Sequence, residues 1–122
     1  MRNLVRGLAM GRIAVGALML VKPEEAMRGW IGRRAASYGG TQTVIRGFGA
    51  RDLSLGAGTL AALIGGKDAR DWVLAGAVGD LGDFVATAAA DDIPASGRVL
   101  VFAMAGAAIA VSAGYLASAS ET

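Results

Sequence analysis

Four long apolar segments follow one another along the chain, over residues 3–21, 44–64, 72–90 and 99–119. Each is close to the roughly 20 residues that a helix needs to cross the hydrocarbon core of a bilayer. The fourth segment contains no charged residue, whereas the other three carry Arg or Asp. The pattern predicts an all-α fold, an integral membrane four-helix bundle that forms one domain over residues 1–122.

Short breaks separate these segments. Pro23 ends the first because proline cannot continue a helix. The Gly65-Gly66 pair predicts a tight turn, so the second and third segments should form an antiparallel hairpin. The alternative for the first segment is a cleavable signal peptide, but Arg12 interrupts its apolar stretch and no clear small-residue cleavage site follows.

The longer connection between the first two spans has its own helical pattern. Pro23, with two glutamates after it, is typical of a helix start. Apolar residues then recur at helical spacing: Met27, Trp30, Ile31, Ala35 and Tyr38. We predict a short interfacial amphipathic helix over residues 23–38, with Trp30 and Tyr38 anchored at headgroup level. The alternative is that the same helix packs on the bundle.

Composition supports a membrane protein. The chain is 54% hydrophobic with a mean hydropathy of +0.50, and it contains 19 glycines. As a soluble domain it would expose unusually large apolar patches, although a soluble Ala-rich helical bundle is the alternative fold. Small residues suit close helix packing in a bilayer. Helix-packing positions are therefore expected on the first span at Gly7 and Gly11, and on the fourth at Gly106, Ala110 and Gly114.

The absence of two residue types limits the chemistry. The chain has no Cys and no His, which excludes disulfides and thiolate sites and removes the commonest general base. Its net charge of +2 comes from scattered residues, which argues against nucleic acid as a partner. We expect no metal, no cofactor and no enzyme activity, since an enzyme would depend on Asp and Arg alone. The expected surroundings are the lipid bilayer of the cell (inner) membrane and a homo-oligomer or larger membrane complex.

Apart from Arg6, near the start of the first span, six ionisable residues lie inside the expected spans: Arg12, Arg46, Arg51, Asp52, Asp80 and Asp83. At about 1.5 Å per residue, all except Arg46 lie roughly 10–15 Å from the membrane edge nearest the long connection. Folding the second span onto the third places Arg51 level with Asp83. An unpaired charge at this depth costs roughly 2.5–3.5 kcal/mol, so we predict that the five deep charges pair. Arg46 is shallower and can reach the interface.

Two interpretations of this charged layer remain open. Asp80 and Asp83 share a helix face with Gly76 and Thr87, and this small, polar face should point inward. The layer is then either an ion-pair network that fixes helix register, or an ion, proton or small-solute site.

Several stretches resemble a group of small actinobacterial membrane proteins of unknown function, the DUF4267-type and DoxX-like four-helix proteins. The resembling stretches are Gly11 to Gly16 through Pro23, Trp30-Ile31-Gly32 and Arg46 to Gly56, together with the Asp80-x-x-Asp83 spacing. The most specific piece is the Arg-Gly-x-Gly-Ala-Arg-Asp run. The resemblance implies four membrane helices, no established substrate and no catalytic residues to transfer. Members often have His near the third-helix acid, which this chain lacks.

Together these observations favour a structural or accessory membrane bundle that packs with itself or a partner. The alternative is a small transporter or channel that uses the charged layer. Basic residues are nearly balanced between the two ends of the expected bundle, so the sequence does not determine its orientation.

Overall fold

The computed structural model describes residues 1–120, and within that range the fold is all-α, with no strand. The helices are α1 (Arg2–Val21), α2 (Pro23–Ile31), α3 (Arg33–Ala36), α4 (Gly39–Ile64), α5 (Arg70–Ala89) and α6 (Ala95–Ala119). The predicted fold class is therefore confirmed at the level of secondary structure.

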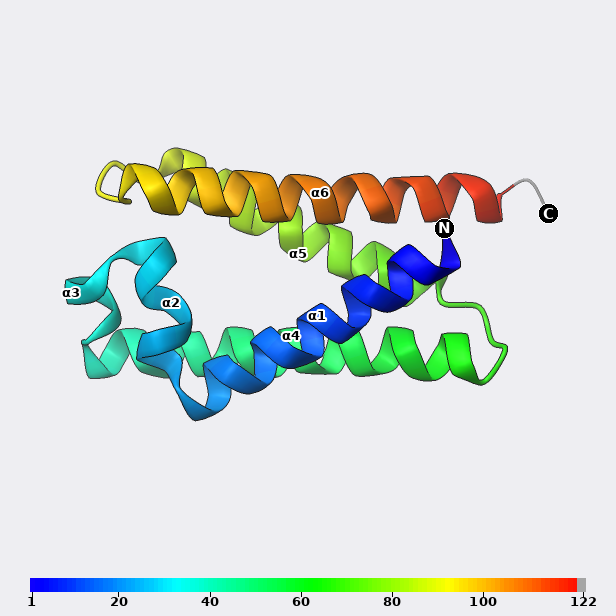
Figure 1. The fold of residues 1–122 in the computed structure, drawn as a ribbon, viewed down its shortest axis with the longest axis horizontal. Helices are drawn as coiled ribbons and strands as arrows, with labels where there is room; N and C mark the ends of the chain where they lie inside the picture. The colour runs from blue at the N-terminus through cyan, green and yellow to red at the C-terminus, as the bar shows by residue number, and fades with distance from the viewer. Residues whose placement is uncertain (121–122) are drawn as a thin grey trace.

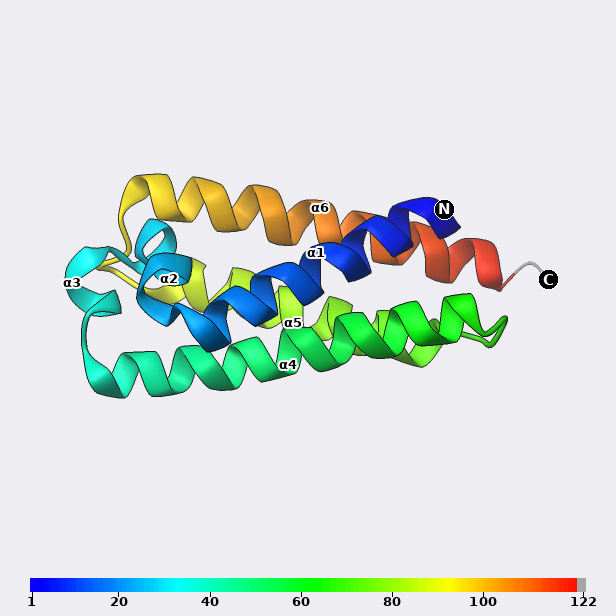
Figure 2. The same cartoon turned by 60° about the horizontal axis from the view of Figure 1, so that its bottom comes forward.

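Four long helices form an elongated bundle (Figure 1). The most extensive packing is between α1 and α4 and between α5 and α6. The start of α1 and the end of α6 lie at the same end of the bundle, and α2 and α3 lie at the other (Figure 2). The long helices run alternately in opposite directions along the bundle (Figure 1).

Glycines bring α1 and α4 into backbone contact. A Cβ atom added at Gly16 would lie 2.6 Å from the Leu53 nitrogen, and one at Gly49 would lie 2.7 Å from the Gly16 oxygen. At Gly56 the nearest atom would be the Ala9 oxygen, at 2.6 Å. Any side chain at these positions would push the helices apart, so glycine is needed for this close approach.

The small residues expected to pack helices have mostly different surroundings. Beside Gly7, Gly11 and Gly106 no atom lies within 4 Å of an added Cβ, and Ala110 is exposed. Only Gly114 faces a neighbour, the Met1 side chain. Close packing within one chain is therefore not seen at these other four positions, and their packing against another chain stays a prediction.

The connection between α1 and α4 is broken into two helices, so the single helix expected over 23–38 is wrong. Gly32 has φ of 91°, a left-handed conformation that interrupts the helix and that glycine adopts without strain. The α2 helix packs on the bundle, where Met27 is buried in a cluster with Met19 and Ile45. This arrangement corresponds to the packed alternative. The α4 helix begins at Gly39, five residues before the expected start at residue 44.

Three of the long helices, α1, α5 and α6, are long and apolar enough to cross a membrane. The α4 helix is not among them, and it carries Arg46, Arg51 and Asp52. Large apolar side chains are exposed along the bundle, including Leu4, Leu74, Val78, Leu81 and Val99. These features indicate a multi-pass membrane protein.

Candidate functional site

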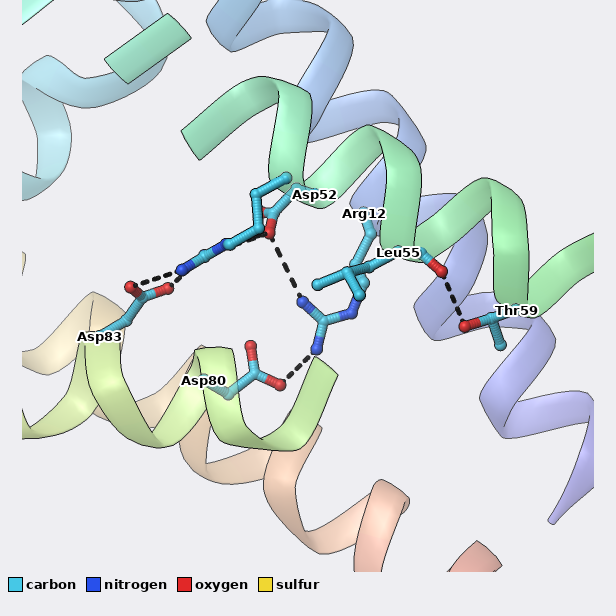
Figure 3. A network of polar contacts seen from close by, with 7 residues as sticks. Arg12, Asp52, Leu55, Thr59, Asp80 and Asp83 are labelled. Atoms are coloured by element: carbon cyan, nitrogen blue, oxygen red, sulfur yellow. Dashed lines mark hydrogen bonds and ion pairs between the residues drawn. The ribbon is translucent and has the colours of Figure 1, made fainter. Parts of the chain in front are cut away.

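Ion pairs join three of the long helices near the middle of the bundle (Figure 3). From α1, Arg12 pairs with Asp80 of α5 and lies 3.7 Å from Asp52 of α4. From α4, Arg51 Nη2 lies 3.1 Å from Asp52 Oδ1 and 2.9 Å from Asp83 Oδ2 of α5. We call these five residues the charge cluster, and it has the membership expected from depth alone.

The cluster has a buried part and a more accessible part. Arg12, Asp52 and Asp80 are 9%, 8% and 7% exposed as residues. The Arg51 and Asp83 side chains are 30% and 21% exposed. Buried charges are tolerated only when they are paired and hydrogen-bonded, so the Arg12 contacts should matter most for folding.

Glycines on α5 make room for both guanidinium groups. A Cβ added at Gly76 would lie 3.0 Å from Arg12 Nη2, and one at Gly79 would lie 3.5 Å from Arg51 Cζ. The Arg51 guanidinium also lies 5.3 Å from the centre of the Phe48 ring, within range of a cation–π contact. The sequence predicted Gly76 on the inward-facing side of this helix, whereas the contacts of Gly79 and Phe48 with Arg51 were not predicted from it.

Arg46 lies apart from the charge cluster, and the face of α5 that carries Asp80 is buried. Arg46 is exposed, and its Nε donates to the Leu20 carbonyl over 3.3 Å, outside the cluster. Gly76, Asp80 and Thr87 are buried, so the small, polar face of α5 does point inward.

A cavity of about 430 Å³ adjoins the cluster. From α4 and α5 it receives only carboxylates, those of Asp52, Asp80 and Asp83. From α1, α2 and α6 it receives Arg12 and otherwise apolar or small residues, among them Met19, Met27, Trp30, Leu100 and Met104. The cavity therefore combines a carboxylate wall with apolar walls, and its position was not predicted from the sequence.

A second polar contact holds α2 beside this cavity. Trp30 Nε1 donates to Thr87 Oγ1 over 3.0 Å, and Arg98 Nη1 donates to the Thr87 carbonyl over 2.9 Å. Arg98 also donates to the Ala90 carbonyl, and Gly97 packs directly on the Trp30 backbone. Trp30 thus binds the bundle, whereas Tyr38 is 54% exposed. Their placement at a membrane interface stays a prediction.

One buried hydroxyl lies near the cluster without a partner. Ser112 is 1% exposed, and its Oγ has no hydrogen-bond partner within the part of the chain that the structure describes. It lines a small cavity of about 10 Å³ together with Arg12 and Thr59. The Thr59 hydroxyl donates instead to the Leu55 carbonyl over 2.7 Å (Figure 3).

Within residues 1–120, no group of three acidic side chains is arranged to hold a metal ion. Comparison with known proteins gives no match to a family model, a curated sequence or a solved structure. The charge cluster and the cavity are therefore the features from which a function can be inferred.

Proposed function

We propose that the protein is a four-span accessory bundle of the cell (inner) membrane, with α4 as the fourth span. The carrying observation is the charge cluster, which neutralises most of the charge on α4 at the depth where that charge is most costly. At 26 residues, α4 has a length of about 39 Å, more than enough to cross the hydrocarbon core. As part of this proposal, we infer that the chain is related to the DoxX-like four-helix proteins that its sequence resembles.

In this role the cluster fixes how α1, α4 and α5 are registered. Apolar surfaces give little specificity inside a bilayer, because lipid tails are as apolar as the helices. Ion pairs between three helices select one depth and one rotation for each helix. The open position at Gly106 and the exposed Ala110, one turn further along α6, leave a small face on which a second copy or a partner helix could pack.

Paired substitutions test the register role. Asp80→Leu alone should reduce the amount of folded protein in the membrane, because it leaves Arg12 without its shortest contact. Adding Arg12→Met should restore accumulation, since a buried ion pair can be replaced by apolar residues at little cost. Arg46→Met, outside the cluster, is the control and should change little. A double variant no better than the worse single variant would contradict the register role.

Association is tested separately. The mass of the purified chain in lipid nanodiscs or mild detergent should exceed that of one copy, either as a homo-oligomer or with a co-purifying partner. A stable isolated monomer in both media, with no co-purifying partner, would contradict the accessory proposal.

A second candidate function, transport or binding of a small solute, is supported by the cavity. The three carboxylates of the cluster line it together with Arg12, so a solute there would contact charged groups of the cluster. Flux across proteoliposomes that depends on Asp83, and is absent from protein-free vesicles, would support this candidate. Equal flux in the two preparations would contradict it.

A further inference from the structure

The charge cluster is not neutral. Its two guanidinium groups face three carboxylates, so it carries one negative charge when all five groups are ionised. The other arginine of α4, Arg46, is engaged by a backbone carbonyl elsewhere and is exposed to the surroundings. An uncompensated charge inside a membrane bundle is costly, and a bound cation would remove that cost.

The negative charge faces the cavity. Arg12 is among the lining residues with all three carboxylates, whereas Arg51 is not. Asp80 is 7% exposed, and its hydrogen bond with Arg12 uses Oδ2. Figure 3 shows the other Asp80 oxygen without an interaction with the residues drawn. One carboxylate oxygen of this buried residue is thus available to a ligand in the cavity.

The rest of the cavity favours an apolar ligand body. Methionine and leucine side chains on α1, α2 and α6 line it, and the volume of about 430 Å³ is within the range of small-molecule sites. The Trp30 ring also lines it, and the bond from its Nε1 to Thr87 holds that ring in place. An aromatic residue and carboxylates that line the same cavity are favourable for binding an organic cation.

We propose that this cavity binds one lipophilic organic monocation, of the quaternary ammonium or phosphonium class, with its charge beside Asp80 and Asp83. A small hydrated cation would lose its water among the apolar walls, and an uncharged lipid chain would leave the cluster charge uncompensated. The inference rests on the binding candidate described above, but it does not require transport.

Equilibrium dialysis of the full chain in nanodiscs against labelled tetraphenylphosphonium tests the site. Tetraphenylborate, which has nearly the same shape and the opposite charge, and empty nanodiscs are the controls. We expect saturable binding of one phosphonium per chain and no specific binding of borate. Asp83→Asn should weaken phosphonium binding by about tenfold or more, because it makes the cluster neutral while retaining both Arg12 pairs.

A second pair of variants leaves every charge intact. Gly11 lines the cavity and has open space beside it, so Gly11→Leu should fill part of the cavity and weaken binding without preventing folding. Gly47 on α4 is equally open and is not a lining residue, so Gly47→Leu should bind as the unaltered chain does.

The outcomes distinguish this inference from the proposed functions. A folded chain that binds phosphonium no better than empty nanodiscs, or binds borate equally well, would overturn the cation site and leave the accessory bundle standing. Unchanged binding in both Asp83→Asn and Gly11→Leu would also overturn it. Saturable, Asp83-dependent binding without flux would support the site and contradict transport.

Discussion

At the scale of single residues, Arg12 occupies the central position in the bundle. It contacts carboxylates on two other helices and is less exposed than Arg51. The guanidinium group fits there because α5 has a glycine, Gly76, where a larger side chain would collide with it. The same substitution should therefore have different effects at the two arginines.

Arg12→Gln should destabilise the bundle by about 3–5 kcal/mol, because it leaves the buried Asp80 without a charge partner. Arg51→Gln should cost less, about 2–3 kcal/mol, because Asp52 keeps its contact with Arg12 and only the partly exposed Asp83 loses its partner. Unfolding in mixed micelles, followed by circular dichroism, measures both. A larger loss for Arg51→Gln would contradict this ranking.

The unpartnered Ser112 hydroxyl provides a substitution that should raise the stability of the bundle. Ser112→Ala should raise stability by about 1 kcal/mol, because it removes a buried polar group that has no hydrogen bond. The exposed Ser54 is the matched control, and Ser54→Ala should change stability little. A clear loss of stability in Ser112→Ala would show that the hydroxyl is satisfied in the membrane.

The charge cluster could be predicted from the sequence because the depth of a residue along a helix follows from its distance in residues from the helix end. The rise per residue is fixed, and the Gly65-Gly66 turn relates α4 to α5, so Arg51 and Asp83 had to lie level. Rotation about each helix axis depends on the packing of many small side chains. The cavity and the bond between Trp30 and Thr87 could not be predicted for that reason.

At the scale of helices, the contact between α1 and α4 depends on which glycines face the partner. Gly47 and Gly49 lie two residues apart on α4, yet only Gly49 faces α1. Sequence motifs of small residues do not reveal this difference. They indicated Gly7 and Gly11, whereas the backbone contacts are made at Gly16 and Gly49.

Gly49→Ala should destabilise the bundle by about 1–3 kcal/mol, because the new methyl group would overlap the backbone of α1. Gly47→Ala should be neutral or stabilise by up to about 1 kcal/mol, because alanine favours helix and the site is open. Thermal unfolding of both variants in the same detergent makes the comparison. Equal effects would argue against the close approach of α1 and α4.

Helix ends were predicted less well than helix centres. The Gly32 break between α2 and α3 depends on one residue in the left-handed region. Gly39 and Gly40 directly follow the helix predicted over residues 23–38, yet they form the start of α4 and not a break before it. Glycine is compatible with both, and tertiary packing selects between them.

At the scale of the whole molecule, the account depends on whether α4 crosses the bilayer. Hydropathy and length alone identify α1, α5 and α6 as candidate spans. The start of α1 and the end of α6 lie at the same end of the bundle (Figure 1), and our proposal accounts for this with four crossings, α4 being the fourth. Pairing of its charges with α1 and α5 is the physical reason that α4 could be accommodated.

The most direct test is thiol labelling at the two ends of α4. The chain contains no cysteine, so single variants carry no background. In sealed vesicles, an impermeant reagent should label Ser37→Cys and Lys67→Cys from opposite sides of the membrane. If the chain inserts in both orientations, the fraction labelled from outside at one site and the fraction labelled from outside at the other should add up to the whole population. Labelling of both sites from the same side would contradict the four-span account.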